Sequence, residues 1–301
     1  MSVNRFVPSL STALVAAAAV RLSSHRHGTS PKARAFKKLL AFLLVLNWRS
    51  LPLVWHIDLW GLVPWIRYRV ITRGPERALA IGKSPFDAKV VTKGYVSFDL
   101  ADWNGHMSNS SYAKALDRAR FKWLLQATGP AFGVEQVWQP LANTSYWFKN
   151  EIPMLAEFEI SVNICAWDDK WVYYVARFTT PPKKGSTERT LNCLALSRSC
   201  FKMKGSRLSI PPARVFAISG LGPDRSNWER TVELRRQRKS RDWLKYGGML
   251  ASRQAGKLPA GVSFTEIPEW NETGMEVYEA QRVAGLAIAE RFSNSDGWDT
   301  L

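Results

Sequence analysis

Residues 156–203 constrain the fold most, because three successive segments there have the pattern of antiparallel strands. Ala156–Ala166 alternates between apolar and polar side chains, with a period of two that is typical of a half-exposed antiparallel strand. The two faces carry Phe158, Ile160, Val162 and Ile164 on one side and Glu157, Glu159, Ser161 and Asn163 on the other. Asp168-Asp169-Lys170 then forms a turn, and Trp171–Thr179 returns with β-branched and aromatic residues. Thr190–Met203 is the last long strand of the predicted sheet.

A helix is predicted ahead of these strands. It begins near Asn109 or Ser110, both good N-cap types, and it ends before Gly129-Pro130. Two shorter strands are expected at Tyr95–Phe98 and Ser145–Phe148. One helix followed by a run of antiparallel strands predicts the α+β class, with the sheet wrapped around the helix.

The loop that leads into this helix carries the residues that could take part in a chemical reaction. It reads Asp102-Trp-Asn-Gly105-His106-Met-Ser-Asn109-Ser-Ser-Tyr112. The first backbone N–H groups of a helix lack intrahelical partners, so this helix start can bind an anion or polarise a carbonyl oxygen. A carboxylate a few residues upstream lies beside that position, where it could act as a nucleophile or a general base.

This loop resembles the signature of the hotdog-fold thioesterases, Asp-x-x-Gly-His-Val/Met-Asn-Asn-x-x-Tyr. The departure is Ser108, where the family more often has asparagine. The resemblance covers about Lys89 to Lys204 and is greatest to membrane-proximal eukaryotic thioesterase-like proteins, which have relatives in fungal secondary metabolism. It implies a hotdog fold, hydrolysis of an acyl thioester of coenzyme A or of an acyl-carrier protein, and a homodimer with its sites at the interface.

The resemblance assigns the chemistry to the loop carboxylate and the helix start. Asp102 would activate water or attack the thioester carbonyl, while Asp99, three residues upstream, is the rival carboxylate. The N–H of Asn109 would polarise the thioester oxygen, and its side chain could also cap the helix. Tyr146-Trp147-Phe148 could line an acyl pocket or belong to the core.

The remaining candidate residues have both a functional and a structural interpretation. Gly105 permits close approach of a ligand to the backbone, and it also suits a turn. His106 is the one histidine of the four in the chain that falls within the core segment, so it is a candidate general base or a structural hydrogen-bonding residue. Tyr112 is expected to pack on the helix, and contact with the substrate is the alternative.

Composition excludes several other classes of protein. The net charge is +17, with no zinc-finger, aromatic RNA-binding or recognition-helix pattern to support nucleic-acid binding. The three cysteines are scattered, which argues against a disulfide framework or a zinc site. An α/β-hydrolase would need a G-x-S-x-G elbow and a late histidine, and the sequence has neither. No metal and no cofactor are expected.

The two ends of the chain are expected to lie outside the catalytic domain. We divide the sequence into a basic arm (1–35), a hydrophobic membrane-associated segment (36–75), a hotdog domain (83–215) and a helical C-terminal extension (216–301). Residues 1–57 hold eight Lys or Arg and no Asp or Glu, and Leu39–Ile66 is apolar but interrupted. Membrane association, at the endoplasmic reticulum or a similar membrane, is the first interpretation. A mitochondrial transit peptide and a helical lid on the core are the alternatives.

The C-terminal extension is predicted to contain a strand and two helices. Arg214–Ser219 has the composition of a strand, and 227–249 and 276–292 have helical patterns. The basic run Arg235–Arg241 is a solvated helix face or an attachment site for anionic lipid. The alternatives to a hydrolase are a non-catalytic hotdog protein that binds acyl groups, a dehydratase-like relative and a scaffold protein at a membrane.

Overall fold

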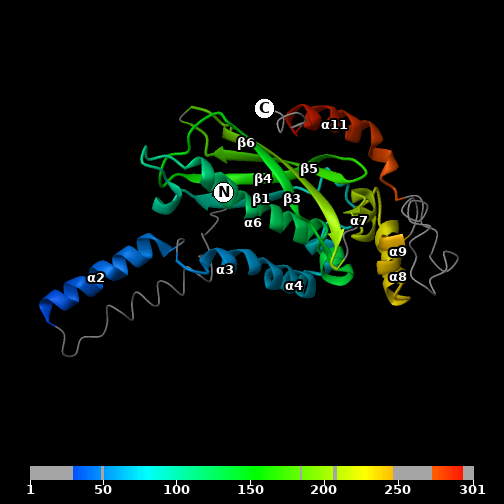
Figure 1. Cartoon of the computed structure of the whole chain (residues 1–301), viewed down its shortest axis with the longest axis horizontal. Coiled ribbons are helices and arrows are strands. Elements are labelled where there is room, and N and C mark those ends of the chain that lie inside the picture. The colour runs from blue at the N-terminus through cyan, green and yellow to red at the C-terminus, as the bar shows by residue number, and fades with distance from the viewer. Residues whose placement is uncertain (1–29, 49–50, 184, 206–208, 247–272, 294–301) are drawn as a thin grey trace.

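A curved antiparallel sheet and one long helix form the centre of the molecule (Figure 1). The computed structural model describes residues 30–48, 51–183, 185–205, 209–246 and 273–293. Within these residues the seven strands are β1 (Val90–Tyr95), β2 (Val137–Trp138), β3 (Leu141–Phe148), β4 (Glu157–Trp167), β5 (Trp171–Thr180), β6 (Thr190–Met203) and β7 (Ser209–Ile210). They are ordered β1-β4-β5-β6, and β2, β3 and β7 all pair with the long strand β6.

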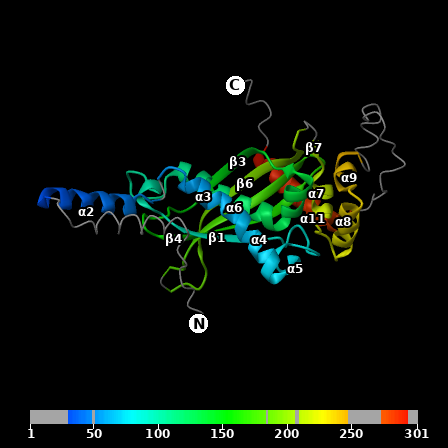
Figure 2. The same cartoon turned by 90° about the horizontal axis from the view of Figure 1, so that it is seen from below.

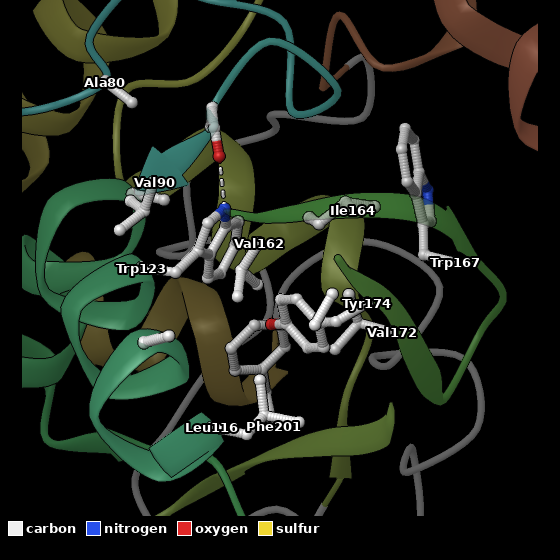
Figure 3. Close-up of a cluster of buried hydrophobic side chains, with 14 of the residues drawn as sticks. Ala80, Val90, Leu116, Trp123, Val162, Ile164, Trp167, Val172, Tyr174 and Phe201 are labelled. Atoms are coloured by element: carbon white, nitrogen blue, oxygen red, sulfur yellow. Dashed lines mark hydrogen bonds between the residues drawn. The ribbon is translucent and has the colours of Figure 1, made fainter. Parts of the chain in front are cut away.

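Helix α6 (Asn109–Ala127) lies in the concave face of this sheet, and its sequence explains why. Its buried residues Tyr112, Leu116, Ala119, Trp123 and Ala127 recur every three or four positions, so they share one helical face. They pack against buried strand residues such as Val162, Ile164 and Tyr174 (Figure 3). The indole N–H of Trp123 donates a hydrogen bond to the Ala88 carbonyl and ties the helix to the segment before β1. The predicted α+β hotdog architecture is confirmed.

The N-terminal helices are α2 (Pro31–Leu46), α3 (Val54–Trp60), α4 (Leu62–Arg73) and the single turn α5 (Pro75–Ala78). Helices α3 and α4 form a further layer on α6, away from the sheet, and α2 extends away from the rest of the molecule (Figures 1 and 2). Leu62 and Ile66 of α4 are buried against Leu124 and Leu125 of α6. Asp58 of α3 forms an ion pair with Arg118 of α6, with Oδ2 and Nε 2.9 Å apart.

The predicted membrane-associated location is wrong. In the part of the chain that the structure describes, no helix has both the length and the apolar character needed to cross a membrane. The apolar stretch is divided among three helices, and its residues Val54, Leu62 and Ile66 are buried by packing within the protein. The lid-like interpretation of this segment is therefore the better one for α3 and α4. The mitochondrial alternative depends on residues 1–35, most of which lie outside the described residues.

The segment after β7 is helical where we predicted a strand. Helix α7 (Pro212–Ile218) replaces the strand expected at Arg214–Ser219. Its residues from Ala213 onward are mostly buried on every side, so the apolar run has no period that could separate helix from strand. Pro212 at the first helical turn is the signal that favours a helix.

The predicted helix 227–249 is two helices, α8 (Ser226–Arg236) and α9 (Ser240–Tyr246), and its last residues lie outside the described ranges. The positive φ of 58° at Arg238 marks the break between them. A short turn, η5 (Glu276–Tyr278), then leads into α11 (Glu279–Ser293), close to the predicted helix 276–292.

Helix α11 covers the outer face of the sheet, opposite α6 (Figure 1). Its Leu286 and Ala289 pack against Tyr173 and Leu196 of the sheet. Gly285 lies so close to the carbonyl of Cys165 that an added Cβ would collide with that oxygen. Layers therefore follow in the order α3–α4, α6, sheet and α11.

Strand and helix limits agree with the sequence prediction in most places. The predicted strands at 156–166, 171–179 and 190–203 correspond to β4, β5 and β6, and the predicted helix is α6. The strand expected at Tyr95–Phe98 instead ends at Tyr95, and Phe98–Leu100 forms the 3₁₀ turn η2.

All three cysteines are free thiols, and Cys193 and Cys200 are buried. The division into four segments stays a prediction.

Candidate active site

The loop between η2 and α6 is a tight, internally bonded turn. Asp102 accepts hydrogen bonds at Oδ1 from the backbone N–H groups of Asn104 at 2.9 Å and His106 at 3.3 Å. Its own N–H donates to the His106 carbonyl at 2.8 Å. Gly105 has a φ of +79°, a conformation that favours glycine, so the sequence supplies the residue that this turn needs. The carboxylate is therefore fixed by the backbone that surrounds it.

A second segment holds the loop from the side. The N–H of Met107 donates to the carbonyl of Ile152, and the N–H of Met154 donates to that of Gly105, both at 2.8 Å. His106 also forms an isolated antiparallel bridge with Pro153. Residues 151–155, which precede β4, are thus part of the scaffold of the loop.

Helix α6 begins directly after the loop, with Ser108 as its N-cap residue. The Ser108 side chain caps none of the first-turn N–H groups, and its Oγ lies 3.0 Å from Oγ of Ser110 instead. Amide groups at the start of α6 are therefore available to polarise an oxygen atom of a ligand. Asn109, which we proposed for this role, is the first residue of the helix.

One surface pocket of about 210 Å³ brings most of the candidate residues together. Its lining contains the predicted residues Asp102, His106, Asn109 and Tyr112. The other lining residues are Asn104, Met107, Phe148, Lys149, Asn150 and Glu151. Gly105 shapes the loop but does not line the pocket. Loop and helix start therefore face one cavity, as the sequence indicated.

His106 is paired with a carboxylate that sequence reasoning missed. Its Nε2 lies 3.2 Å from Oε2 of Glu151, whose side chain is 73% exposed. Glu151 follows β3 by three residues, and no motif in the sequence marks it. Among the described residues, the hydrogen bonds to Asp102 Oδ1 come from backbone N–H groups and not from the imidazole of His106. The geometry thus couples His106 to Glu151 and not to Asp102.

Tyr112 is a packing residue that reaches the pocket wall. It is 2% exposed, and its ring makes an edge contact with Phe148 and a tilted contact with Phe178, with ring centroids 5.0 and 4.9 Å away. Burial raises the pKa of the Tyr112 phenol far above its usual value. The hydroxyl therefore stays protonated at neutral pH and can donate or accept a hydrogen bond but not act as a base.

The strand aromatics that we proposed as pocket residues face in different directions. Tyr146 and Phe148 are two residues apart on β3, so they point to the same side, and their rings stack at 6.0 Å. Phe148 lines the pocket. Trp147 lies on the other face, in the cluster beneath α11.

Asp99, the rival carboxylate, does not line the Asp102 pocket. Its side chain is 10% exposed, its Oδ1 accepts a hydrogen bond from Ser97 Oγ at 2.5 Å, and its Oδ2 lies 3.8 Å from Lys114 Nζ. The 3₁₀ turn η2 directs it into a separate cavity beneath α3. Within the described residues, no three His, Cys, Asp or Glu side chains cluster as metal ligands.

Comparison with known proteins finds a matching family model for the central segment. Residues 96–217 match the family model of the thioesterase-like superfamily. The match covers the loop, α6 and strands β2 to β7, which is less than half of the chain.

Three similar curated proteins are fungal. A probable thioesterase of Emericella nidulans, atnL, is 28% identical over 218 residues, covering 60% of this chain and 70% of the relative. The thioesterase lcsJ of Purpureocillium lilacinum is 25% identical, covering 72% and 70%. A probable thioesterase of Saccharomyces cerevisiae is 27% identical, covering 62% and 80%.

Among solved structures, the 4-hydroxybenzoyl-CoA thioesterase of Pseudomonas sp. strain CBS-3 is 17% identical, with a TM-score of 0.37, covering 42% of this chain and 96% of that one. A Staphylococcus aureus protein in complex with CoA is 13% identical, with a TM-score of 0.37, covering 44% and 80%.

Proposed function

We propose that the protein hydrolyses an acyl thioester of coenzyme A or of an acyl-carrier protein. The thioesterase class is supported by the family of residues 96–217 and by the names of the fungal relatives. The observation that carries the proposal is the shared pocket of Asp102 and Asn109, which joins a fixed carboxylate to the start of α6. A role in secondary metabolism would be one setting for such an enzyme.

In this mechanism the start of α6 polarises the thioester carbonyl. The developing oxyanion would accept hydrogen bonds from first-turn N–H groups, including that of Asn109, at the positive end of the helix dipole. Oδ1 of Asp102 is held by two backbone N–H groups, so Oδ2 is the oxygen that we assign to the reaction.

Two routes use Asp102 differently. As a general base, Asp102 takes a proton from water while the hydroxide oxygen bonds to the carbonyl carbon. The C–S bond then breaks, and the thiolate leaves and takes up that proton. As a nucleophile, Asp102 bonds to the carbonyl carbon and expels the thiolate, and water then hydrolyses the resulting anhydride. Single-turnover hydrolysis in ¹⁸O-labelled water separates the routes, because the anhydride route can place label in the Asp102 carboxylate.

The Asp102→Asn variant tests the function. We expect it to lose at least a hundredfold in kcat, because general-base or nucleophilic chemistry supplies about 10²–10⁴ in rate. Thiol release is measured on the full chain with short, medium, long and aromatic acyl-CoAs and with acyl-carrier proteins. Asn keeps an oxygen that can accept the two backbone N–H groups, so the loop should still fold.

Asp168→Asn is the matched control, because Asp168 also accepts two backbone N–H groups in a turn, from Lys170 at 2.7 Å and Trp171 at 2.6 Å. Its activity should match that of the wild type. A wild-type protein that is well folded and inactive on every thioester would contradict the proposed hydrolase.

The second candidate is an acyl-binding protein that does not hydrolyse its ligand. The observation that favours it is Ser108, which replaces the asparagine common in the family and makes no capping bond to α6. Isothermal titration with a non-hydrolysable acyl-CoA ether distinguishes the two: binding without turnover of the matching thioester would support the second candidate.

We propose that the active form is a homodimer, as the hotdog resemblance implies, and two exposed apolar side chains in the segments that form the pocket support it. Trp103, next to Asp102, is 94% exposed, and Leu155 is 58% exposed at a positive φ of 66°. Exposed apolar side chains that together form a patch mark protein–protein contact sites, and a second copy of the chain would cover these two. Light scattering should give twice the monomer mass, and Trp103→Ser should weaken the dimer and lower activity together. A fully active monomer would contradict this proposal.

A further inference from the structure

A second cavity lies between α3, α6 and the β1–β4 edge of the sheet. Its internal space is about 60 Å³, enough for roughly four ordered waters or a chain of a few carbon atoms. It shares no lining residue with the Asp102 pocket. The N-terminal helix α3 forms one wall, so the cavity exists only because the chain has this extra layer.

The carboxylate of Asp99 leaves one buried oxygen in this cavity without a hydrogen-bond donor. The side chain is 10% exposed, and Oδ1 is satisfied by Ser97. Oδ2 is buried and accepts no hydrogen bond, since its ionic partner Lys114 Nζ lies 3.8 Å away, beyond hydrogen-bond distance. Buried oxygens of this kind ordinarily have a donor, so the cavity should receive one.

Trp55 of α3 supplies the complementary group. Trp55 lines the same cavity, and its buried indole N–H donates to no acceptor in the described residues. Two residues that line this cavity therefore carry an unpaired buried donor and an unpaired buried acceptor. A hydroxyl group can serve both, because it donates one hydrogen bond and accepts others.

The charges and the walls of the cavity specify the rest of the ligand. Asp58 is paired with Arg118, Asp99 with Lys114, and Lys93 with Glu159 at 3.2 Å, so no charge calls for a counter-ion. The remaining walls are mainly apolar, from Val54, Leu59, Leu100, Ala115, Phe158 and Ile160. The ligand is therefore neutral, with an aliphatic body and a polar donor.

We propose that this cavity binds a neutral hydroxylated aliphatic chain, whose hydroxyl donates to Asp99 Oδ2 and accepts from Trp55 Nε1. Asp99 is thus a binding residue, and α3 is the element that closes its site. The chain could be the end of the acyl group of the substrate or a separate small molecule.

The acyl source rests on the proposed function. Three peptide units separate Asp99 from Asp102, so their Cα atoms lie within about 11 Å, a span that a medium-length acyl chain can cover.

The first test uses 1-hexanol and its isomer 1-methoxypentane, which has the same atoms but no donor. Binding to the full chain is followed by the indole N–H resonance of Trp55, assigned as the signal that Trp55→Phe removes. The alcohol should shift this resonance, and the ether should bind at least tenfold more weakly. Asp99→Leu should weaken binding of the alcohol about tenfold. If the leucine variant does not fold, Asp99→Asn replaces it in the same binding test.

Trp60→Phe is the matched control, because Trp60 is on the same helix, is 55% exposed and does not line the cavity. Its binding of the alcohol should equal that of the wild type. Equal binding of alcohol and ether, or no shift of Trp55 with either probe, would overturn the proposal.

The second test identifies the source. Hydrolysis of 8-hydroxyoctanoyl-CoA is compared with that of octanoyl-CoA. A preference for the hydroxylated thioester that Asp99→Leu abolishes supports the acyl chain as ligand, while binding of the alcohol without that preference supports a separate molecule. If no thioester is hydrolysed, the proposed function fails, and the resonance of Trp55 still decides the cavity proposal.

Discussion

The backbone of the loop around Asp102 requires particular residue types at two of its positions. Gly105 is required by a positive φ, and Asp102 by two N–H groups that need an acceptor. The partners from other segments were not predictable. Glu151 reaches His106 through an irregular connection after β3, and Asp99 turns away because η2 is a 3₁₀ turn and not an extended strand. Neither fact leaves a period or a motif in the sequence.

His106 gives a prediction at this scale. Because its imidazole pairs with the exposed Glu151 and not with Asp102, we expect His106→Gln to lower kcat/KM by less than about tenfold. The loss in kcat/KM of Asp102→Asn should be at least ten times larger than that of His106→Gln. Steady-state kinetics on one acyl-CoA measures both. Equal losses for the two variants would instead make His106 the general base.

Secondary structure elements were predictable where their period was clear. Strand β4 alternates and helix α6 shows an apolar face, so both agree with the sequence. Helix α7 is buried on nearly all sides and lacks that contrast. The basic run at the end of α8 was also only partly solvated, because Arg235 points inward, where Nε and Nη2 donate to Glu135 at 2.9 Å each.

The Glu135–Arg235 pair should anchor α8 to the core. Glu135 is fully buried, so Arg235→Met leaves an unpaired buried carboxylate and should lower the free energy of unfolding by about 3–5 kcal/mol. Arg236→Met is the matched control, since that side chain is 77% exposed and pairs with Glu233 on the surface. Its effect should stay within about 0.5 kcal/mol. Urea unfolding measures both, and equal effects would refute a special role for Arg235.

At the scale of the whole molecule, packing between helices explains the apolar N-terminal stretch, which composition alone did not. The apolar N-terminal stretch predicted a membrane segment, whereas α3 and α4 bury part of it on α6. A sequence read one segment at a time cannot show that two apolar surfaces cover each other. The layered arrangement is therefore the least predictable part of the structure.

Burial of thiols across the sheet predicts an alkaline limit to stability. Burial raises the pKa of Cys165 and Cys193 from 9.0 to about 12. Stability is unaffected by these thiols below pH 9, and it falls as the pH rises from 9 to 12, because only the unfolded chain releases their protons there. The loss is on the order of 1 kcal/mol per pH unit for each thiol.

Urea midpoints between pH 8 and pH 11 test this prediction. Cys193→Ala should show a shallower fall over that range than the wild type. Parallel curves for the two proteins would contradict the assignment to the thiol.

Helix α11 is synthesised well after the sheet that it covers, which affects folding on the ribosome. The sheet is complete in sequence soon after Met203, but the helix that covers Tyr173, Leu196 and Trp147 begins about 75 residues later, at Glu279. At roughly 5–20 residues per second, the ribosome needs about 4–15 seconds to supply it. During that interval the outer face of each nascent sheet is bare, so neighbouring chains on one messenger RNA can meet through it before the cover arrives.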